Sequence, residues 1–214
     1  MTNRETIIFV HGIWMPGAEM TLLRRRMARL GYRTLQFSYP SVRRSLDGNA
    51  LELQRFITSQ HLEQAHVVGH SLGGIVSLRA FAISPWLPPG RIVCLGSPLC
   101  GSIAATRLDR FRLGRRILGM TIHEGVMRVP AAQWARGVVS DRDVGVVAGT
   151  TPLGLGRIVT RFAGPNDGTV ALSETQIPGA ADHIAVPVNH TALVTSMLVA
   201  KQVDAFLRQG QFRR

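Results

Sequence analysis

The sequence predicts an α/β fold in which helices cover both faces of a mostly parallel sheet. Short apolar runs alternate with longer amphipathic segments along the chain, a pattern typical of such sheets. One of these runs passes directly into a helical pattern through a glycine-rich turn at residues 69–74. The chain has 214 residues and no internal repeat, and we therefore predict a single domain over residues 1–214.

Six strands are predicted from apolar runs that are bounded by glycine, proline or polar residues. They are residues 6–10, 33–39, 65–69, 91–95, 144–149 and about 183–188. Pro40 ends the second strand, and a Gly-Ser-Pro turn at residues 96–98 ends the fourth.

The helices are predicted from apolar side chains that recur at helical spacing. They are residues 18–30, 48–60, 72–83 and 191–208. Gly31 closes the first of them as a carboxyl-terminal cap. The long connection over residues 99–142 has the least regular pattern, and it could form a small cap or lid.

The composition is that of a soluble globular protein, with 45% hydrophobic and 18% charged residues. No run of about 18 uncharged apolar residues predicts a membrane-spanning helix. The apolar run at residues 7–10 is too short for the core of a signal peptide, so the predicted location is the cytoplasm. Cys94 and Cys100 indicate neither a disulfide framework nor a metal site.

The formal net charge of +12 comes almost entirely from arginine, because Lys201 is the only lysine. Such a charge is compatible with an anionic substrate or an anionic membrane surface. An arginine-rich composition with solvated side chains is the simpler explanation of this charge. The arginines are dispersed and no nucleic-acid-binding motif accompanies them, so we do not expect nucleic acid as a partner.

Ser71 is the predicted nucleophile. It lies in the sequence AHVVGHSLGG at residues 65–74, where an apolar strand must turn at once into an amphipathic helix. Glycines two residues before and two residues after the serine leave room for that sharp turn. The turn also places Ser71 at a helix amino terminus, which favours developing negative charge. His70 is interpreted as a scaffold residue beside the turn.

An alkoxide attacking a carbonyl creates an oxyanion, which backbone N–H groups can stabilise. The residue after the nucleophile, Leu72, should supply one donor. Gly12 lets the chain turn sharply after the first strand, so we predict Ile13 as the second donor and Trp14 as the alternative. Trp14 and Met15 are also candidates to contact the substrate, although core packing explains them equally well.

An acid and a base should follow the serine in that order along the chain. Asp167 lies on a Gly-Pro-Asn-Asp-Gly loop beyond the fifth strand, and His190 precedes the last helix. His183 is a rival base, but it falls at the start of the sixth strand. Glu174 is the alternative acid.

These pieces together resemble the α/β-hydrolase superfamily, and within it the small lipase- and esterase-like branch. The resemblance rests on the HG pair at residues 11–12, GHSLGG at residues 69–74, and Asp167 followed by His190. The branch includes minimal bacterial lipases and hydrolases related to the enzymes that deacylate the inositol of GPI anchors. The LGSP turn at residues 95–98 is also similar to that branch.

The resemblance implies a six-stranded sheet in the order 2-1-3-4-5-6, a minimal version that lacks the first two strands of fuller members. It implies Ser71, Asp167 and His190 as a catalytic triad, with Ile13 and Leu72 as oxyanion donors. It implies no cofactor and no metal.

Arginines and apolar residues interleave within the 99–142 connection. The arginines are Arg107, Arg110, Arg112, Arg115 and Arg116. Three alternatives remain for this segment: a short amphipathic cap over the active site, a patch that docks on anionic lipid, or a surface helix with solvated arginines.

The predicted function is hydrolysis of carboxylic esters, with a small acyl ester or a lipid as substrate, through an acyl-enzyme on Ser71. Two alternatives remain open at this point. One is an acyltransferase or thioesterase with the same triad. The other is a non-catalytic module that keeps the fold and binds a lipid surface through its arginines.

Overall fold

Six parallel strands form one sheet in the computed structural model of the protein, which describes residues 4–154 and 156–214. Along the sheet the order is β2-β1-β3-β4-β5-β6. The strands are β1 (Thr6–Val10), β2 (Arg33–Phe37), β3 (Ala65–His70), β4 (Ile92–Leu95), β5 (Val144–Gly149) and β6 (Asp182–Val186). The predicted fold and strand order are therefore confirmed.

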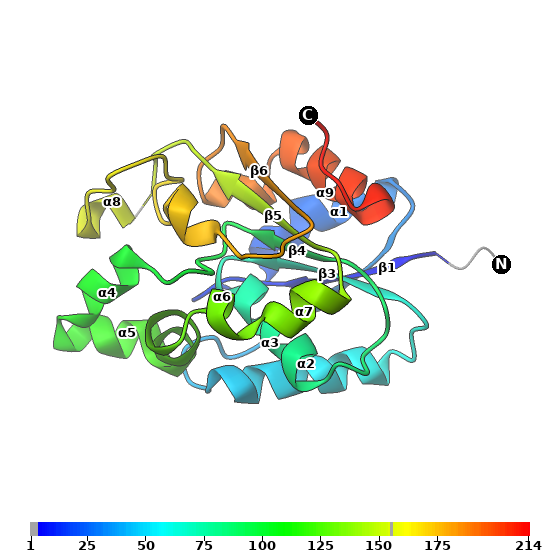
Figure 1. The fold of residues 1–214 in the computed structure, drawn as a ribbon, viewed down its shortest axis with the longest axis horizontal. Coiled ribbons are helices and arrows are strands. Elements are labelled where there is room, and N and C mark those ends of the chain that lie inside the picture. Colours follow the sequence, from blue (N-terminus) through cyan, green and yellow to red (C-terminus); the bar gives the residue numbers. More distant parts are fainter. Residues whose placement is uncertain (1–3, 155) are drawn as a thin grey trace.

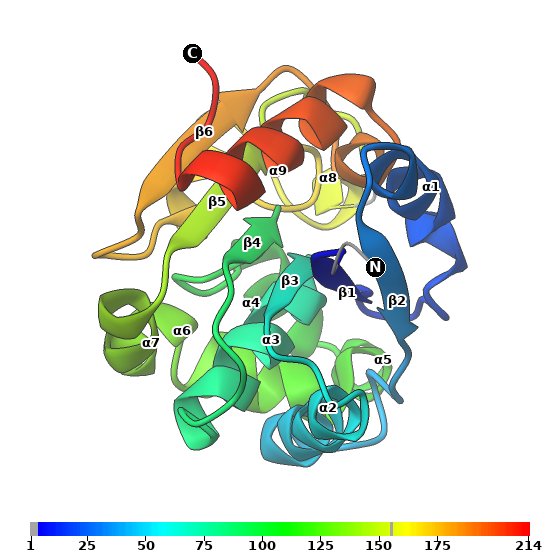
Figure 2. The same cartoon turned by 90° about the vertical axis from the view of Figure 1, so that its right-hand side faces the viewer.

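Helices cover both faces of the sheet (Figure 2), and a separate apolar core lies between the sheet and the helices on each face. One face carries α1 (Thr21–Arg29) and α9 (Met197–Gln209). The other carries α2 (Leu46–Ser59), α3 (Leu72–Ile83), α6 (Ala131–Trp134) and α7 (Arg136–Asp141). The central strands β1, β3, β4 and β5 are buried along their whole length, as apolar runs in a parallel sheet require.

Some boundaries differ from those predicted, for local reasons. Strand β2 ends at Phe37 because the Tyr39 N–H donates to a side chain, Nε2 of His11, instead of continuing the sheet. Helix α2 begins two residues early because the Ser45 hydroxyl caps its first turn by accepting from the Gly48 N–H. The predicted helix over residues 191–208 is divided into a short turn, η4 (Thr191–Val194), and α9.

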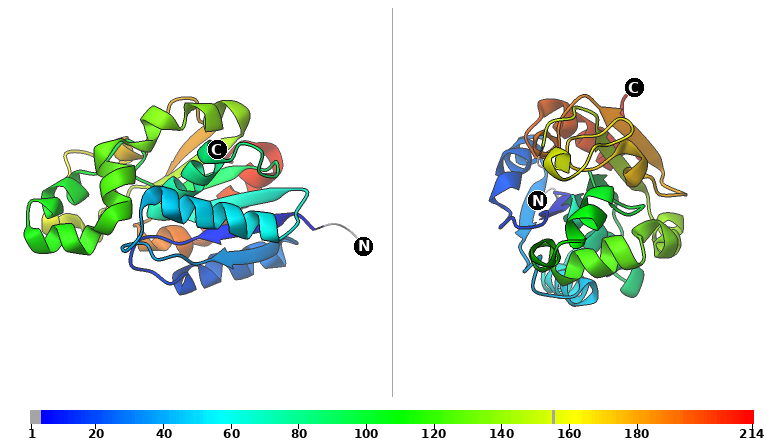
Figure 3. Two further views of the ribbon diagram at one scale, coloured as in Figure 1. Left: turned by 90° about the horizontal axis from the view of Figure 1, so that it is seen from below. Right: turned by 90° about the vertical axis from the view of Figure 1, so that its left-hand side faces the viewer.

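The 99–142 connection forms several short helices, and those of its first part extend beyond the sheet at the carboxyl ends of the strands (Figures 1 and 3). Its first part contains α4 (Ile103–Asp109), α5 (Arg112–Ile122) and the wide turn η2 (His123–Arg128). Helix α8 (Gly156–Val159) contacts α4 from the connection after β5. None of the helices in the described ranges has the length and apolar character needed to cross a bilayer.

Candidate active site

Ser71 lies at the junction of β3 and α3 with a backbone conformation that few residues other than glycine adopt. Its φ is 54° and its ψ is −121°. Such a conformation costs on the order of 1–3 kcal/mol and persists only where the surroundings impose it. Here the Ser71 N–H donates to the Leu95 carbonyl at 2.8 Å, which extends the pairing of β3 and β4 by one residue. The predicted strand-to-helix turn is therefore present.

Two glycines of the turn are required by close backbone approach. A Cβ atom at Gly69 would lie 2.5 Å from the Gly74 Cα, and one at Gly73 would lie 2.2 Å from the Val10 carbonyl oxygen. Both distances are far below van der Waals contact. The start of α3 therefore lies directly against the end of β1, which brings the loop after β1 to Ser71.

Asp167 and His190 form a short hydrogen bond. The His190 Nδ1–H donates to Oδ2 of Asp167 at 2.6 Å, and the carboxylate is almost completely buried. The other carboxylate oxygen accepts from the N–H groups of Thr169 and Val170 at 2.9 and 2.7 Å. These contacts fix the carboxylate, and they leave Nε2 of the imidazole free to accept a proton.

Gly96 provides the space in which this pair sits. A Cβ atom there would lie 3.1 Å from Oδ2 of Asp167 and 3.2 Å from Nδ1 of His190. Because Gly96 follows Leu95, whose carbonyl holds the Ser71 N–H, the Asp167–His190 pair lies beside the strand end that supports the serine turn.

His70 connects the serine turn to His190. Its Nε2–H donates to the His190 backbone carbonyl at 3.1 Å, and the two ring centroids are 4.8 Å apart. Burial lowers the pKa of His70 to about 3, with a smaller contribution from His190, so the ring is neutral near pH 7. This contact joins residues 120 positions apart, and the sequence carries no local signal for it.

The loop after β1 is held by a second buried histidine. The His11 Nδ1–H donates to the Gly12 carbonyl at 2.7 Å, its Nε2 accepts from the Tyr39 N–H, and its ring stacks on that of Tyr39. Burial lowers the pKa of His11, which keeps this donor and acceptor pattern. A Cβ atom at Gly12 would lie 3.3 Å from the Ser71 Cβ, so the loop passes directly beside the serine.

The two predicted oxyanion donors differ in their availability. The Trp14 N–H is already bound, because it donates to the Ser41 hydroxyl at 3.0 Å. Within the described part of the chain, the N–H groups of Ile13 and Leu72 have no acceptor. The geometry therefore favours Ile13 over Trp14 as the donor from this loop.

A cavity of about 130 Å³ opens beside Ser71. Ile13 and Trp14 line it, together with residues of α4, α5 and η2. Met15, the other candidate substrate contact, is not among the lining residues and is 44% exposed. The 99–142 connection thus contributes one wall of the space next to the serine.

The rival base and acid have other partners. Nε2 of His183 lies 2.9 Å from the Thr175 hydroxyl, within hydrogen-bonding distance. Glu174 accepts from the N–H groups of Ile103 and Ala171, so its carboxylate holds the start of α4. Neither residue contacts the Asp167–His190 pair through a hydrogen bond in the described structure.

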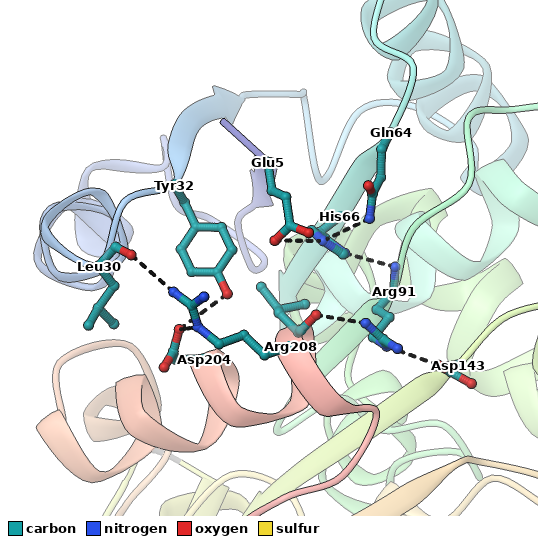
Figure 4. Close-up of polar contacts among 10 residues, drawn as sticks. Glu5, Leu30, Tyr32, Gln64, His66, Arg91, Asp143, Asp204 and Arg208 are labelled. Atoms are coloured by element: carbon teal, nitrogen blue, oxygen red, sulfur yellow. Dashed lines mark hydrogen bonds and ion pairs between the residues drawn. The ribbon is translucent and has the colours of Figure 1, made fainter. Parts of the chain in front are cut away.

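Another histidine, His66, lies near the amino-terminal end of β3, at the end of the sheet opposite Ser71. Figure 4 shows it among Glu5, Gln64 and Arg91, where its Nδ1 accepts from the Arg91 N–H at 2.9 Å. Asp143 pairs with the Arg91 side chain in the same cluster. These residues lie at the amino-terminal ends of their strands, whereas Ser71 follows the carboxyl end of β3. The length of the strands therefore separates them from Ser71.

Solved structures with similar folds include lipases and esterases. A Bacillus licheniformis lipase in its mature form aligns with a TM-score of 0.75 and 16% identity, over 98% of this chain and 93% of that one. A Bacillus subtilis carboxylesterase gives 0.63 and 16%, over 98% and 85%. A bacterial membrane phospholipase A gives 0.67 and 13%, over 98% and 80%.

At these identities the likeness establishes the fold alone. No curated protein sequence matches the chain. The sequence profile of the alpha/beta hydrolase family matches residues 7–207, which include the serine turn, the Asp167 loop and His190. The chain belongs to the alpha/beta hydrolase family.

Proposed function

We propose that the protein hydrolyses carboxylic esters through an acyl-enzyme formed on Ser71. The observation that carries this proposal is the 2.6 Å hydrogen bond between Asp167 and His190, held beside a serine in a strained strand-to-helix turn. A buried carboxylate, an oriented imidazole and a serine at a helix amino terminus are the components of nucleophilic acyl transfer.

In the proposed reaction, Nε2 of His190 takes the proton of the Ser71 hydroxyl as the serine oxygen attacks the ester carbonyl. The N–H groups of Ile13 and Leu72 stabilise the oxyanion that forms. As this intermediate collapses, the C–O bond to the alcohol breaks, and His190 gives the alcohol its proton. Water then attacks the acyl-enzyme by the same steps, which releases the acid and restores Ser71.

The buried Asp167 supports this sequence by accepting the Nδ1–H, which keeps Nε2 as the basic nitrogen and stabilises the imidazolium. His70 remains neutral because its pKa is lowered to about 3, so it adds no second positive charge beside the protonated His190. The structure thus supports His70 as a residue that positions the base.

We further propose that residues 99–142 form a cap that contacts anionic lipid. Arginines on α4 and α5 accompany large apolar side chains that are exposed to solvent. The arginines are Arg107, Arg110, Arg112, Arg115 and Arg116, and the apolar residues are Phe111, Leu113, Ile117 and Met120. A surface that combines exposed apolar side chains with cations suits the interface of an anionic bilayer.

Fluorophosphonate labelling of the wild type and of Ser71→Ala, followed by peptide mapping, tests the assignment of the nucleophile. We expect the probe on Ser71, no labelling of Ser71→Ala, and loss of p-nitrophenyl ester hydrolysis with little change in thermal unfolding. Ser59→Ala, which alters an exposed serine of α2, is the control and should keep full activity. Undiminished hydrolysis by folded Ser71→Ala would overturn the proposal.

A further inference from the structure

The 99–142 connection supplies one apolar wall of the cavity beside Ser71. Helix α4 provides Ala104, Ala105 and Leu108. Leu118 and Ile122 come from α5, and further lining residues include Ile13, Pro98, Val126, Val159 and Val170. Among the described residues, the polar side-chain groups that line the cavity are the hydroxyls of Ser71, Ser102 and Thr169 and the indole of Trp14, whose N–H donates to the Ile117 carbonyl. This composition suits a hydrocarbon group and provides no countercharge.

The position of the cavity assigns it to the acyl part of an ester. Ser71 and Ile13 line it, whereas His190 does not. During the proposed reaction the alcohol must lie near His190, because that histidine gives it a proton as it leaves. The acyl group stays bonded to the serine oxygen while its carbonyl oxygen faces the Ile13 N–H. The acyl chain is therefore the part of the substrate that enters the cavity.

The size of the cavity limits the length of that chain. A volume of about 130 Å³ is slightly smaller than the roughly 150 Å³ engineered cavity that accommodates benzene, a molecule of six carbons. Two alanines of α4 leave this space open, and Leu108 and Leu118 bound it. A hydrocarbon of about four to six carbons fits the space.

The arginines on α4 and directly after it face a different space. Arg107 and Arg110 line a separate hollow of about 490 Å³ together with Thr106 and Glu174. The face of the helix that carries Ala104, Ala105 and Leu108 is apolar, so a charged acyl group would lose its hydration in the cavity without gaining a partner.

We infer that the enzyme prefers uncharged acyl groups of about four to six carbons, and that Ala105 and Leu108 of α4 set this length. The inference rests on the proposed ester hydrolysis at Ser71. It adds the class of acyl group and the wall that selects it.

The test is a series of p-nitrophenyl esters from acetyl to dodecanoyl, measured as kcat/KM. Each methylene that becomes buried is expected to raise kcat/KM about fourfold up to the butanoyl or hexanoyl ester. Beyond that length the chain exceeds the cavity, and we expect a fall of at least about tenfold at the dodecanoyl ester. A succinyl ester, which is charged, should react at least about tenfold more slowly than the butanoyl ester.

Two variants change the wall in opposite directions. Ala105→Leu fills the cavity and should move the maximum to acetyl or propanoyl, whereas Leu108→Ala enlarges it and should move the maximum beyond hexanoyl. Thr106→Leu on α4 and Leu51→Ala on α2 are matched controls, because these side chains do not line the cavity. Thermal unfolding of each variant identifies any that fail to fold.

The outcomes separate this inference from the proposed function. If Ser71 is labelled but the wild type prefers dodecanoyl esters, the inference on chain length is wrong while ester hydrolysis stands. If folded Ala105→Leu and Leu108→Ala both keep the wild-type profile, α4 does not select the acyl group. If Ser71 is not labelled and no ester is cleaved, the proposed function itself fails.

Discussion

His190, His70 and His11 differ in the groups to which their rings are hydrogen-bonded. His190 bonds to the buried Asp167 carboxylate, whereas His70 and His11 bond to backbone groups and lie in apolar surroundings. Of these three rings, only that of His190 donates to a carboxylate. The buried carboxylate orients the His190 ring, whereas His70 and His11 hold the backbone around it.

Replacing Asp167 with Asn should test the role of that charge. The amide keeps the size of the side chain but removes its negative charge, and it can reverse the tautomer of His190. We expect kcat to fall by about 10³–10⁴-fold, as for the equivalent change in a serine-protease triad, with little change in KM. Asp143→Asn, at the opposite edge of the sheet, should retain activity, and equal losses in both variants would argue against a specific role for Asp167.

The buried His70 predicts how stability depends on pH. Its pKa is about 3 in the folded protein against 6.5 as the ordinary value, so the unfolded chain binds the extra proton between these limits. Its contribution to stability is therefore complete above pH 6.5 and is lost as the pH falls toward 3. In His70→Gln this contribution is absent.

Urea denaturation of the wild type and His70→Gln at pH 7 and near pH 4 measures the effect. The glutamine amide can still donate to the His190 carbonyl, but it does not titrate. We expect the variant to lose less stability on acidification than the wild type. A stability difference that is the same at both pH values would contradict the assigned pKa shift.

At the scale of elements, α5 and the loop after β1 are joined by one side chain. The Trp14 indole N–H donates to the Ile117 carbonyl at 2.9 Å, and Trp14 has a φ of 61°. Helix α5 is broken at Gly119, where φ is 69° and where a Cβ would lie 2.2 Å from the Val42 carbonyl oxygen. The break lies just after Ile117. In an unbroken helix the Ile117 carbonyl would accept a hydrogen bond from the N–H four residues further along the chain.

Trp14→Phe should therefore weaken the oxyanion site indirectly. The ring remains, but the hydrogen bond to α5 is lost, and the Ile13 N–H beside it is held less firmly. We expect kcat to fall between about twofold and tenfold, which corresponds to the net free energy of one hydrogen bond. Trp86→Phe removes an exposed indole elsewhere and should leave kcat unchanged. A change in KM alone would indicate that Trp14 only lines the cavity.

The elements that the sequence predicted well are those with local signals. Apolar runs between glycine or proline turns identified the strands, and the helix after Ser71 was predicted with its observed ends, residues 72–83. The sequence pattern of the 99–142 connection does not indicate where its individual helices begin and end. Its helices are short and broken, as at Gly119, because contacts with distant segments such as Val42 decide where they end.

The candidate site divides in the same way. The Asp167–His190 pair follows from the order of residues along a chain of this fold, and the structure brings the two together. The contact of His70 with the His190 carbonyl and the space left by Gly96 depend on distant partners, so no sequence pattern indicated them. The catalytic roles of these residues remain predictions.

For the whole molecule, the net charge of +12 predicts salt-dependent attachment to anionic lipid. We expect cosedimentation with vesicles of phosphatidylglycerol, and its loss as the salt rises from about 0.05 M to about 0.5 M. Little binding should occur to vesicles of phosphatidylcholine alone. The proposed contact with the bilayer consists of the arginines and exposed apolar side chains of α5.

A charge-matched pair of double variants locates this surface. Arg112→Glu with Arg116→Glu changes two cations of α5, and Arg29→Glu with Arg55→Glu makes the same change on α1 and α2. We expect the first pair to reduce vesicle binding at least about fivefold more than the second. Equal reductions would mean that only the total charge matters.

The N–H of Ser71 has a further consequence for the motions of this protein. It donates to the Leu95 carbonyl at the carboxyl ends of two central strands, so its exposure to solvent requires the pairing of β3 and β4 to open. Its exchange with deuterium should therefore be as slow as global unfolding, whereas amides of α5 should exchange through local opening. The proposed nucleophile is thus expected on a slowly exchanging part of the backbone, beside a segment whose amides exchange faster.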